Sequence, residues 1–123
     1  MTRAVRGAIL AKKNERSAIY EAAVRLAREI TSANEIRDED IVSILFSLTD
    51  DLDAGNPAAA LREVGFVETP LFCVQEAKVE GGMAKVIRVL LTFNGDSDRK
   101  PVAVYLDGAE ALRPDIAWGR KQR

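Results

Sequence analysis

The sequence predicts an α+β fold, in which a mixed β-sheet carries helices on one of its faces. Three stretches divide their side chains between two faces with a period of two, one longer stretch repeats apolar residues at helical spacing, and an Asn-Pro start followed by a Gly predicts a second, shorter helix. The expected order is strand, helix, strand, helix and then three strands. The length of 123 residues fits one domain, residues 1–123. Since both helices are expected on one face, the uncovered face predicts an oligomer packed sheet to sheet.

The first strand is expected at Arg3–Leu10, followed by an amphipathic helix. Side chains of this strand divide between two faces: Val5, Gly7 and Ile9 on one, and Arg6, Ala8 and Leu10 on the other. Gly7 beside Arg6 indicates close approach of a ligand or another backbone, or else a bulge or a packing requirement. Asn14 is the expected N-cap of the helix. The apolar stripe of the helix is expected to be core: Ile19, Ala22, Ala23, Leu26, Ala27, Ile30 and Ala33.

A second strand is expected at Ile41–Thr49 and a second, shorter helix after it. The faces of the strand are expected to hold Val42, Ile44, Phe46 and Leu48 on one side, and Ser43, Leu45 and Ser47 on the other. Asn56 and Pro57 open the short helix as N-cap and first helical residue. This helix carries Arg62, and Gly65 is expected to end it in the left-handed conformation.

The stretch Leu71–Leu91 joins the third strand to the fourth. The third strand is expected at Val67–Phe72, where Pro70 indicates an edge or a bulge. A Gly81-Gly82 turn separates it from the fourth strand. The faces of the fourth strand are expected to hold Ile87, Val89, Leu91 and Phe93 on one side, and Val86, Arg88, Leu90 and Thr92 on the other.

Arg88 lies in the middle of this fourth strand among aliphatic neighbours. A guanidinium in such a place is costly unless an anion or a carboxylate pairs with it. Glu76 is one candidate partner and a bound anionic substrate is another, and the residues alone leave both open. The final strand is expected at Val102–Leu106 and includes Tyr105, and a tail without periodicity follows.

Composition excludes several classes of function. With 18 basic and 19 acidic residues the net charge is −1, so nothing favours binding to nucleic acid or to an anionic membrane. The absence of histidine and the single cysteine exclude Ser-His-Asp and Cys-His catalysis, histidine-rich metal sites and an internal disulfide. The lone cysteine, together with the lack of a signal peptide or an apolar span, predicts a cytoplasmic protein. The terminal basic cluster is expected to be solvated: Arg120, Lys121 and Arg123.

Six motifs occur in one order: R-A-V-R-G-A, P-A-A-A-L-R-E, P-L-F-C-V-Q-E, V-I-R-V-L, V-Y-L and A-L-R-P-D. In this order they resemble the AroH-type monofunctional chorismate mutases, the class typified by the Bacillus enzyme, over nearly the whole chain. The resemblance implies a homotrimer whose three mixed sheets form a pseudo-barrel, with helices outside and active sites between adjacent subunits. It also implies a Claisen rearrangement of the dianion chorismate to prephenate, in phenylalanine and tyrosine biosynthesis, without cofactor, metal or covalent intermediate.

The same resemblance implies roles for individual residues. Arg6 and Tyr105 would hold a substrate carboxylate, and Arg88 would be the cation beside the breaking ether oxygen. Glu76 and the backbone at Cys73 would bind the ring hydroxyl. The further pocket residues that it implies are Arg62, Phe72, Val74 and Gln75, together with Leu112 and Arg113 of a C-terminal tail, at about 108–123, that closes over the site.

The chain departs from the family pattern at three positions. Family members often have Phe at the position of Asn56, Lys at that of Ala59 and Thr at that of Phe72. These changes remove an apolar wall, a cation near the entrance and a hydroxyl, and they bear on affinity more than on chemistry. Two alternative functions remain: a small trimeric enamine/imine hydrolase of the Rid type, and a non-catalytic trimer that binds an aromatic-pathway metabolite.

Overall fold

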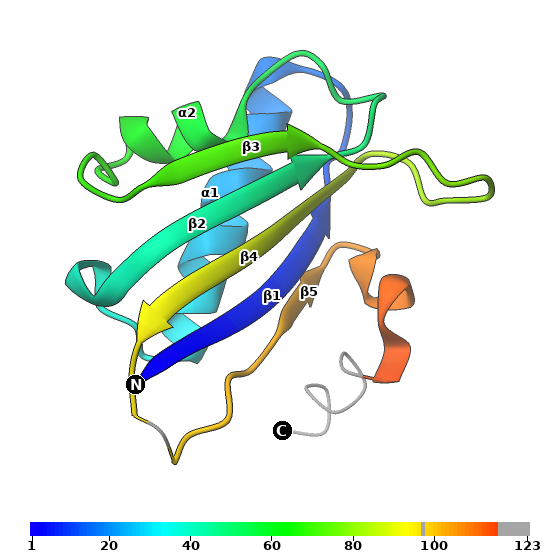
Figure 1. Cartoon of the computed structure of the whole chain (residues 1–123). Helices are drawn as coiled ribbons and strands as arrows, with labels where there is room; N and C mark the ends of the chain where they lie inside the picture. The colour runs from blue at the N-terminus through cyan, green and yellow to red at the C-terminus, as the bar shows by residue number, and fades with distance from the viewer. Residues whose placement is uncertain (97, 116–123) are drawn as a thin grey trace.

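The computed structural model describes residues 1–96 and 98–115 and confirms the predicted fold class. The strands and helices are β1 (Thr2–Leu10), α1 (Arg16–Ala33), β2 (Ile41–Leu48), α2 (Pro57–Glu63), β3 (Leu71–Gln75), β4 (Val86–Asn94) and β5 (Val104–Leu106), with the short 3₁₀ helices η1 (Asp38–Asp40) and η2 (Ala109–Leu112). The strands form one five-stranded sheet with the order β3-β2-β4-β1-β5 (Figure 1). β4 is antiparallel to β1 and β2, whereas β5 is parallel to β1 and β3 to β2, so the sheet is mixed.

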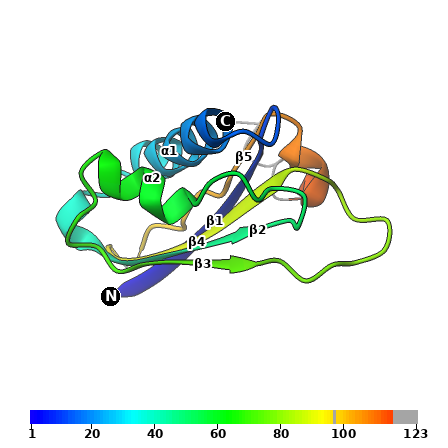
Figure 2. The same ribbon diagram turned by 90° about the horizontal axis from the view of Figure 1, so that it is seen from above.

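Both helices lie on the same face of the sheet, as Figure 2 shows. The core fills the space between them and the sheet, where Ile9, Phe46 and Leu91 are each exposed by 1% or less. Of the seven predicted residues of the α1 stripe, Ala33 is half-buried. The other six are buried: Ile19, Ala22, Ala23, Leu26, Ala27 and Ile30. Among the described residues, no helix combines the length and the apolar character needed to cross a membrane.

Gly7 lies where α1 and β5 both come close to β1. A Cβ atom built on Gly7 would lie 2.6 Å from the carbonyl oxygen of Val104 and 2.9 Å from Cδ1 of Ile30. The missing side chain therefore makes room for a neighbouring backbone and for helix packing, on the face of β1 opposite to Arg6. Of the interpretations open from the sequence, the structure supports these two rather than close approach of a ligand.

Asn56 caps α2 as predicted, but Asn14 does not cap α1. The Asn56 side chain accepts a hydrogen bond from the Ala58 N–H at 2.8 Å. The N-cap of α1 is Glu15. The side-chain oxygen of Asn14 instead accepts from the backbone N–H groups of Asp53 and Ala54, at 3.1 Å each. Asparagine serves loops and helix ends equally well, and here a loop distant in sequence supplies the donors.

Three predicted strand details are wrong, each for a local reason. β2 has a bulge between Ile41 and Ser43, so Val42 is an extra residue and is 42% exposed instead of facing the core. β3 begins at Leu71 rather than at Val67, because proline at position 70 has no N–H to donate. β5 begins at Val104 rather than Val102, because the N–H and C=O of Val102 bond to the Asn34 side chain, at 2.7 and 3.0 Å.

The start of β4 is fixed by the loop that follows β2. The N–H of Val86 donates to Oγ1 of Thr49 at 3.0 Å, and the N–H of Lys85 donates to Oδ2 of Asp51 at 2.9 Å. Lys85 has a φ of 57°, a left-handed conformation that is strained for a lysine. The hydrogen bond from Thr49, helped by the one from the Lys85 backbone, lowers the pKa of the Asp51 carboxyl. The ionised form of Asp51 thus stabilises this turn.

We expect Gly7→Ala to destabilise the protein by roughly 1–3 kcal/mol, the usual cost of overpacking a core. The added methyl group would meet a backbone oxygen that cannot move without disturbing the β1–β5 pairing. Urea unfolding would measure the loss. Gly55→Ala is the matched control, because its Cβ would meet the Tyr20 ring at 3.2 Å, and a ring can yield. Equal losses from the two variants would contradict this account.

Stability is expected to depend on pH through Asp51. Because its pKa is lower in the folded than in the unfolded chain, its contribution is fully present above about pH 4, the ordinary range of aspartate, and is lost as the pH falls through the folded value. Asp51 is exposed, so the contribution should be below about 1 kcal/mol. Urea unfolding of wild type and Asp51→Asn should differ at pH 6, and the difference should shrink progressively as the pH falls below about 4. A difference independent of pH would refute the role of the charge.

Candidate active site

The face of the sheet opposite to the helices carries two rows of side chains that run across the strands. The pairing registers define the rows as Val74, Ser47, Arg88, Ala8 and Tyr105, and Phe72, Leu45, Leu90 and Arg6. Arg6 and Arg88 thus point to the same side from neighbouring strands. Alternation along β1 and β4 correctly predicted that Arg6 shares a side with Ala8, and Arg88 with Leu90. The strand order then shows which of these residues are neighbours across the sheet.

Arg88 and Glu76 form an ion pair on this face. Nε of Arg88 lies 2.5 Å from Oε1 of Glu76. The contact is short, but the Nε–H does not point along it, and within the described residues Nε is a buried donor without a hydrogen-bond acceptor. The charges are in contact while the hydrogen bond remains unmade. Glu76, one of the two candidate partners of Arg88, is therefore in place. The guanidinium of Arg88 still has N–H groups that can donate to another acceptor.

The Tyr105 hydroxyl lies within reach of the positive charges of three arginines. The Tyr105 side chain is packed against Ala8 and is only 6% exposed. Burial raises the pKa of the Tyr105 hydroxyl, while the positive charges of Arg6, Arg113 and Arg88 act in the opposite direction. All three arginines are thus close enough to act on this hydroxyl, and the net effect keeps it protonated at neutral pH.

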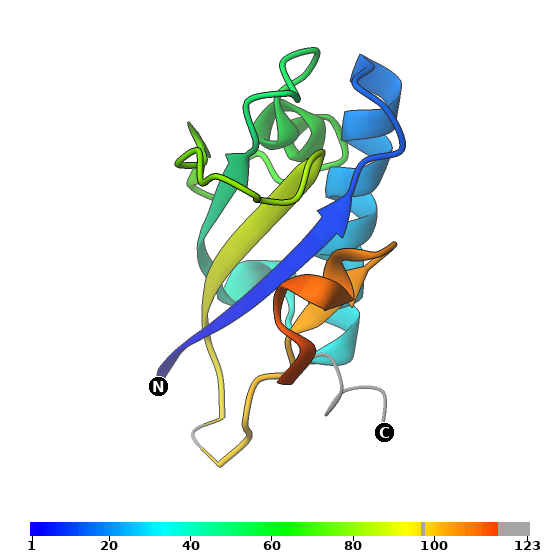
Figure 3. The ribbon, with the colours of Figure 1, turned by 90° about the vertical axis from the view of Figure 1, so that its right-hand side faces the viewer.

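A cavity of about 630 Å³ opens beside Arg88 and Glu76. Its walls come from the loop after β2, the loop between β3 and β4, and η2, which contributes Leu112. η2 lies against β1 and the edge strand β5 (Figure 3). Arg113 follows it and donates two hydrogen bonds to the carboxylate of Asp115, at 3.1 and 3.2 Å. The predicted tail is described only as far as residue 115, and the basic cluster Arg120, Lys121 and Arg123 lies outside the described residues.

Five of the residues assigned to the site lie apart from Arg88 in the single chain. Phe72 and Val74 share its face, but they lie on β3, the edge strand two places away from β4. Cys73 and Gln75 alternate to the opposite side, and the Cys73 side chain packs against the core, where burial raises the pKa of its thiol. Arg62 lies exposed on α2, in the helical layer.

Ser47 contacts this site and was not among the predicted site residues. It is paired with Arg88 across β2 and β4, and its hydroxyl donates to Oε1 of Glu76 at 3.3 Å. The alternation of β2 put Ser47 on the polar side of the strand, but nothing in the sequence indicated that β2 lies next to β4.

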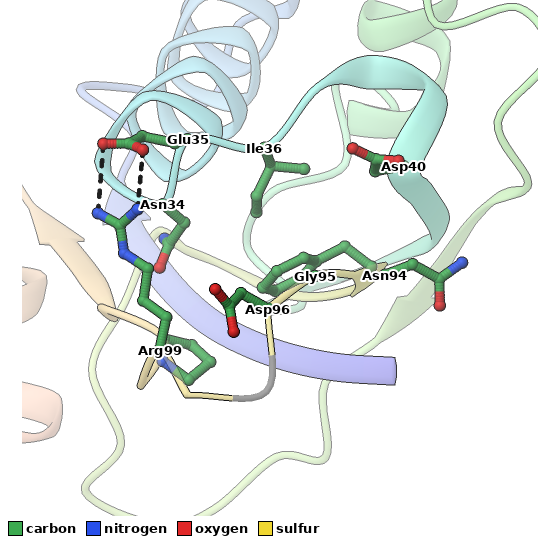
Figure 4. Close-up of a pocket in the computed structure, with 10 residues that line it drawn as sticks. Asn34, Glu35, Ile36, Asp40, Asn94, Gly95, Asp96 and Arg99 are labelled. Carbon is green, nitrogen blue, oxygen red and sulfur yellow. Dashed lines mark hydrogen bonds and ion pairs between the residues drawn. The ribbon is translucent and has the colours of Figure 1, made fainter. Parts of the chain in front are cut away.

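A second cavity, of about 310 Å³, lies at the far end of β4 (Figure 4). Its charged groups are paired with one another, with the Arg37 side chain or with nearby backbone. Arg99 donates to both carboxylate oxygens of Glu35, at 2.8 and 3.4 Å, and Asp40 accepts from Arg37. None of the predicted site residues lines it. Among the described residues, no three histidine, cysteine, aspartate or glutamate side chains are placed to hold a metal ion.

Comparison with known proteins relates this geometry to one family. The family model described as chorismate mutase type I matches residues 2–116. Two curated relatives named chorismate mutase AroH are each 37% identical: the Thermus thermophilus protein over 94% of this chain and 97% of its own, and the Bacillus subtilis protein over 95% and 94%. A solved chorismate mutase structure from Clostridium thermocellum superposes with a TM-score of 0.86 at 40% identity, covering 89% of this chain and 99% of that one. The chain therefore belongs to the type I chorismate mutase family.

Proposed function

We propose that this chain is a chorismate mutase, which rearranges chorismate to prephenate for the synthesis of phenylalanine and tyrosine in the cytoplasm. The observation that carries the proposal is the arrangement of Arg88: a cation on a central strand, next to a cavity, with a carboxylate at one edge. Family membership identifies the reaction for which such a cation is suited.

The chemistry fits the residues because a Claisen rearrangement needs no proton transfer, and so no histidine. The substrate is a dianion, and its ether oxygen gains negative charge as the C–O bond breaks. Catalysis then requires one reactive conformer to be held and a fixed positive charge to be placed at that oxygen. Arginine suits this task, because it stays protonated when partly buried and offers several donors.

The polar residues that the sequence assigned to the site divide the tasks of this reaction between them. Arg88 acts at the ether oxygen, and Arg6 with Tyr105 holds a carboxylate. The raised pKa of Tyr105 favours its neutral form, which can donate a hydrogen bond to that carboxylate. Glu76, together with the backbone at Cys73, binds the ring hydroxyl. Cys73 has its side chain turned to the core, so its backbone is the part available for this contact.

The magnitudes are compatible with a leading role for Arg88. A rate enhancement of roughly 10⁶-fold, at the low end for enzymes, requires about 8 kcal/mol. Loss of one preorganised donor typically costs about 3–4 kcal/mol. Arg88 then supplies a large part of the total, and selection of the conformer by Arg6 and Tyr105 supplies more.

The assembly that we propose is a homotrimer with sites between subunits. Four large apolar side chains are 38–66% exposed on the open face: Leu45, Phe72, Val74 and Leu90. A monomer would leave these in water. A neighbouring subunit that presents its α2 and β3 to the cavity would also deliver Arg62 and Phe72, which lie apart from Arg88 within one chain. The described tail residues Leu112 and Arg113 would close the site from the side of β5.

Light scattering is expected to give a mass three times that of the chain. Leu90→Lys should lower this mass to one chain and abolish activity, because it places a charge in an apolar interface. Ser32→Lys adds the same charge on the outer surface of α1 and serves as the control, with mass and activity expected to stay unchanged. A wild-type monomer at micromolar concentration would rule out the trimer.

Replacement of Arg88 by citrulline tests the function itself. Citrulline keeps the shape and most hydrogen bonds of arginine but removes the charge. Because the charge is needed only in the transition state, we expect kcat to fall by roughly 10²–10³ or more, with a smaller change in KM. Arg88→Lys keeps the charge but loses the planar group, and should fail nearly as badly. The assay follows loss of chorismate by ultraviolet absorbance, with prephenate identified separately.

Two controls separate catalysis from other roles of Arg88. Melting temperatures measured on the same samples show whether a variant has lost only its stability. If Arg88 served only to pair with Glu76, both variants would melt earlier while their folded fraction turned over normally. Binding of chorismate by the wild type without formation of prephenate would indicate a non-catalytic binding protein instead.

A further inference from the structure

We infer that Ser47 is a positioning residue for the proposed reaction: its hydroxyl holds the Glu76 carboxylate at the Nε edge of Arg88, so that the terminal nitrogens of the guanidinium stay available to the substrate. This inference rests on the proposed function and concerns the same site. Ser47 need not touch the substrate, because it acts through Glu76.

The first observation is that β2 holds Glu76 at two points. The backbone N–H of Glu76 donates to the carbonyl oxygen of Leu48 at 2.7 Å, although β3 ends one residue earlier. The Ser47 hydroxyl donates to Oε1 of the Glu76 side chain at 3.3 Å. The backbone bond places the residue, and the hydroxyl bond selects the direction in which its carboxylate points.

The second observation is that one oxygen receives both contacts. Oε1 of Glu76 accepts from Ser47 and also lies 2.5 Å from Nε of Arg88. Nevertheless the Nε–H is not aligned with that oxygen, and Nε is buried without an acceptor among the described residues. An unrestrained carboxylate would rotate to accept this hydrogen in line, because charge-assisted bonds with good geometry are the stronger ones. A second donor on the same oxygen opposes that rotation.

The third observation concerns what remains free on Arg88. Its side chain is 43% exposed, although Nε itself is buried, so the exposed part consists of other atoms of the side chain. Arg88 also lines the cavity. A planar guanidinium can form a two-bond pair with a carboxylate, and such a pair would occupy a terminal nitrogen as well as Nε. By holding Oε1, Ser47 keeps the ion pair at one edge and leaves the other side of the group for the ether oxygen.

The experiment compares Ser47→Ala, Ser47→Thr and Ser43→Ala with the wild type in the chorismate assay. We expect Ser47→Ala to lower kcat by about tenfold, the effect of losing one long hydrogen bond to a charged group. Ser47→Thr keeps the hydroxyl and suits a strand, so it should retain most of the activity. Ser43→Ala is the matched control, because Ser43 lies on the same strand but pairs with Thr92, far from Arg88. It should leave kcat unchanged.

A double-mutant cycle with Glu76→Ala, which removes the acceptor of the Ser47 hydroxyl, shows whether Ser47 acts through Glu76. If it does, Ser47→Ala should change kcat/KM much less in the Glu76→Ala background than in the wild type. The same tenfold loss in both backgrounds would overturn the inference, as would a fully active Ser47→Ala variant. Melting temperatures of Ser47→Ala and Ser47→Thr should lie close together, and a loss of activity that follows melting temperature alone would also count against it. A wild-type chain that leaves chorismate unchanged would overturn the proposed function and this inference together.

Discussion

The antiparallel pairing of β4 with both β1 and β2 is the constraint on which the candidate site depends. β4 is the central strand of the sheet, and its register decides which residues lie beside Arg88. A shift of one residue would turn Arg88 toward the helices and bring an aliphatic side chain to the cavity. The buried residues of β4 on its other face prevent that shift, since each would have to leave the core. The packing of the core therefore also holds the charge in position.

Much of this arrangement could be predicted from the sequence because strands have a period of two. Alternation alone assigned Arg6 and Arg88 to one side of their strands and the core residues to the other. It failed at Val42, because the extra residue of a bulge reverses which face the residues before the bulge point to. The amino-acid composition does not reveal where such a bulge occurs. Alternation also overlooked Ser47, whose importance depends on the order of the strands. Strand order is a property of the whole sheet, and residues as distant in sequence as Ser47 and Arg88 carry little local information about it.

The residues that lie apart within the single chain illustrate a second limit. The motifs containing Arg62 and Phe72 were assigned to the site by resemblance to a family, yet one chain keeps them away from Arg88. No alternation or helical spacing could show this, because the pattern of a chain does not distinguish contacts within a subunit from contacts with a neighbour. The helices on a single face, and the apolar side chains exposed on the other, indicate that something covers the open face, but they do not fix its orientation.

The loop between β3 and β4 is held at both of its ends by β2 and its following loop. The Glu76 N–H bonds to Leu48 at one end, and Lys85 and Val86 bond to Asp51 and Thr49 at the other. Between these anchors the chain forms a wall of the cavity but no part of the sheet. Doubling the length of such a segment costs only about 0.6 kcal/mol in closure entropy. Evolution or protein engineering can therefore lengthen, shorten or replace this wall, and so reshape the cavity, while the strands that carry Arg6 and Arg88 stay where they are.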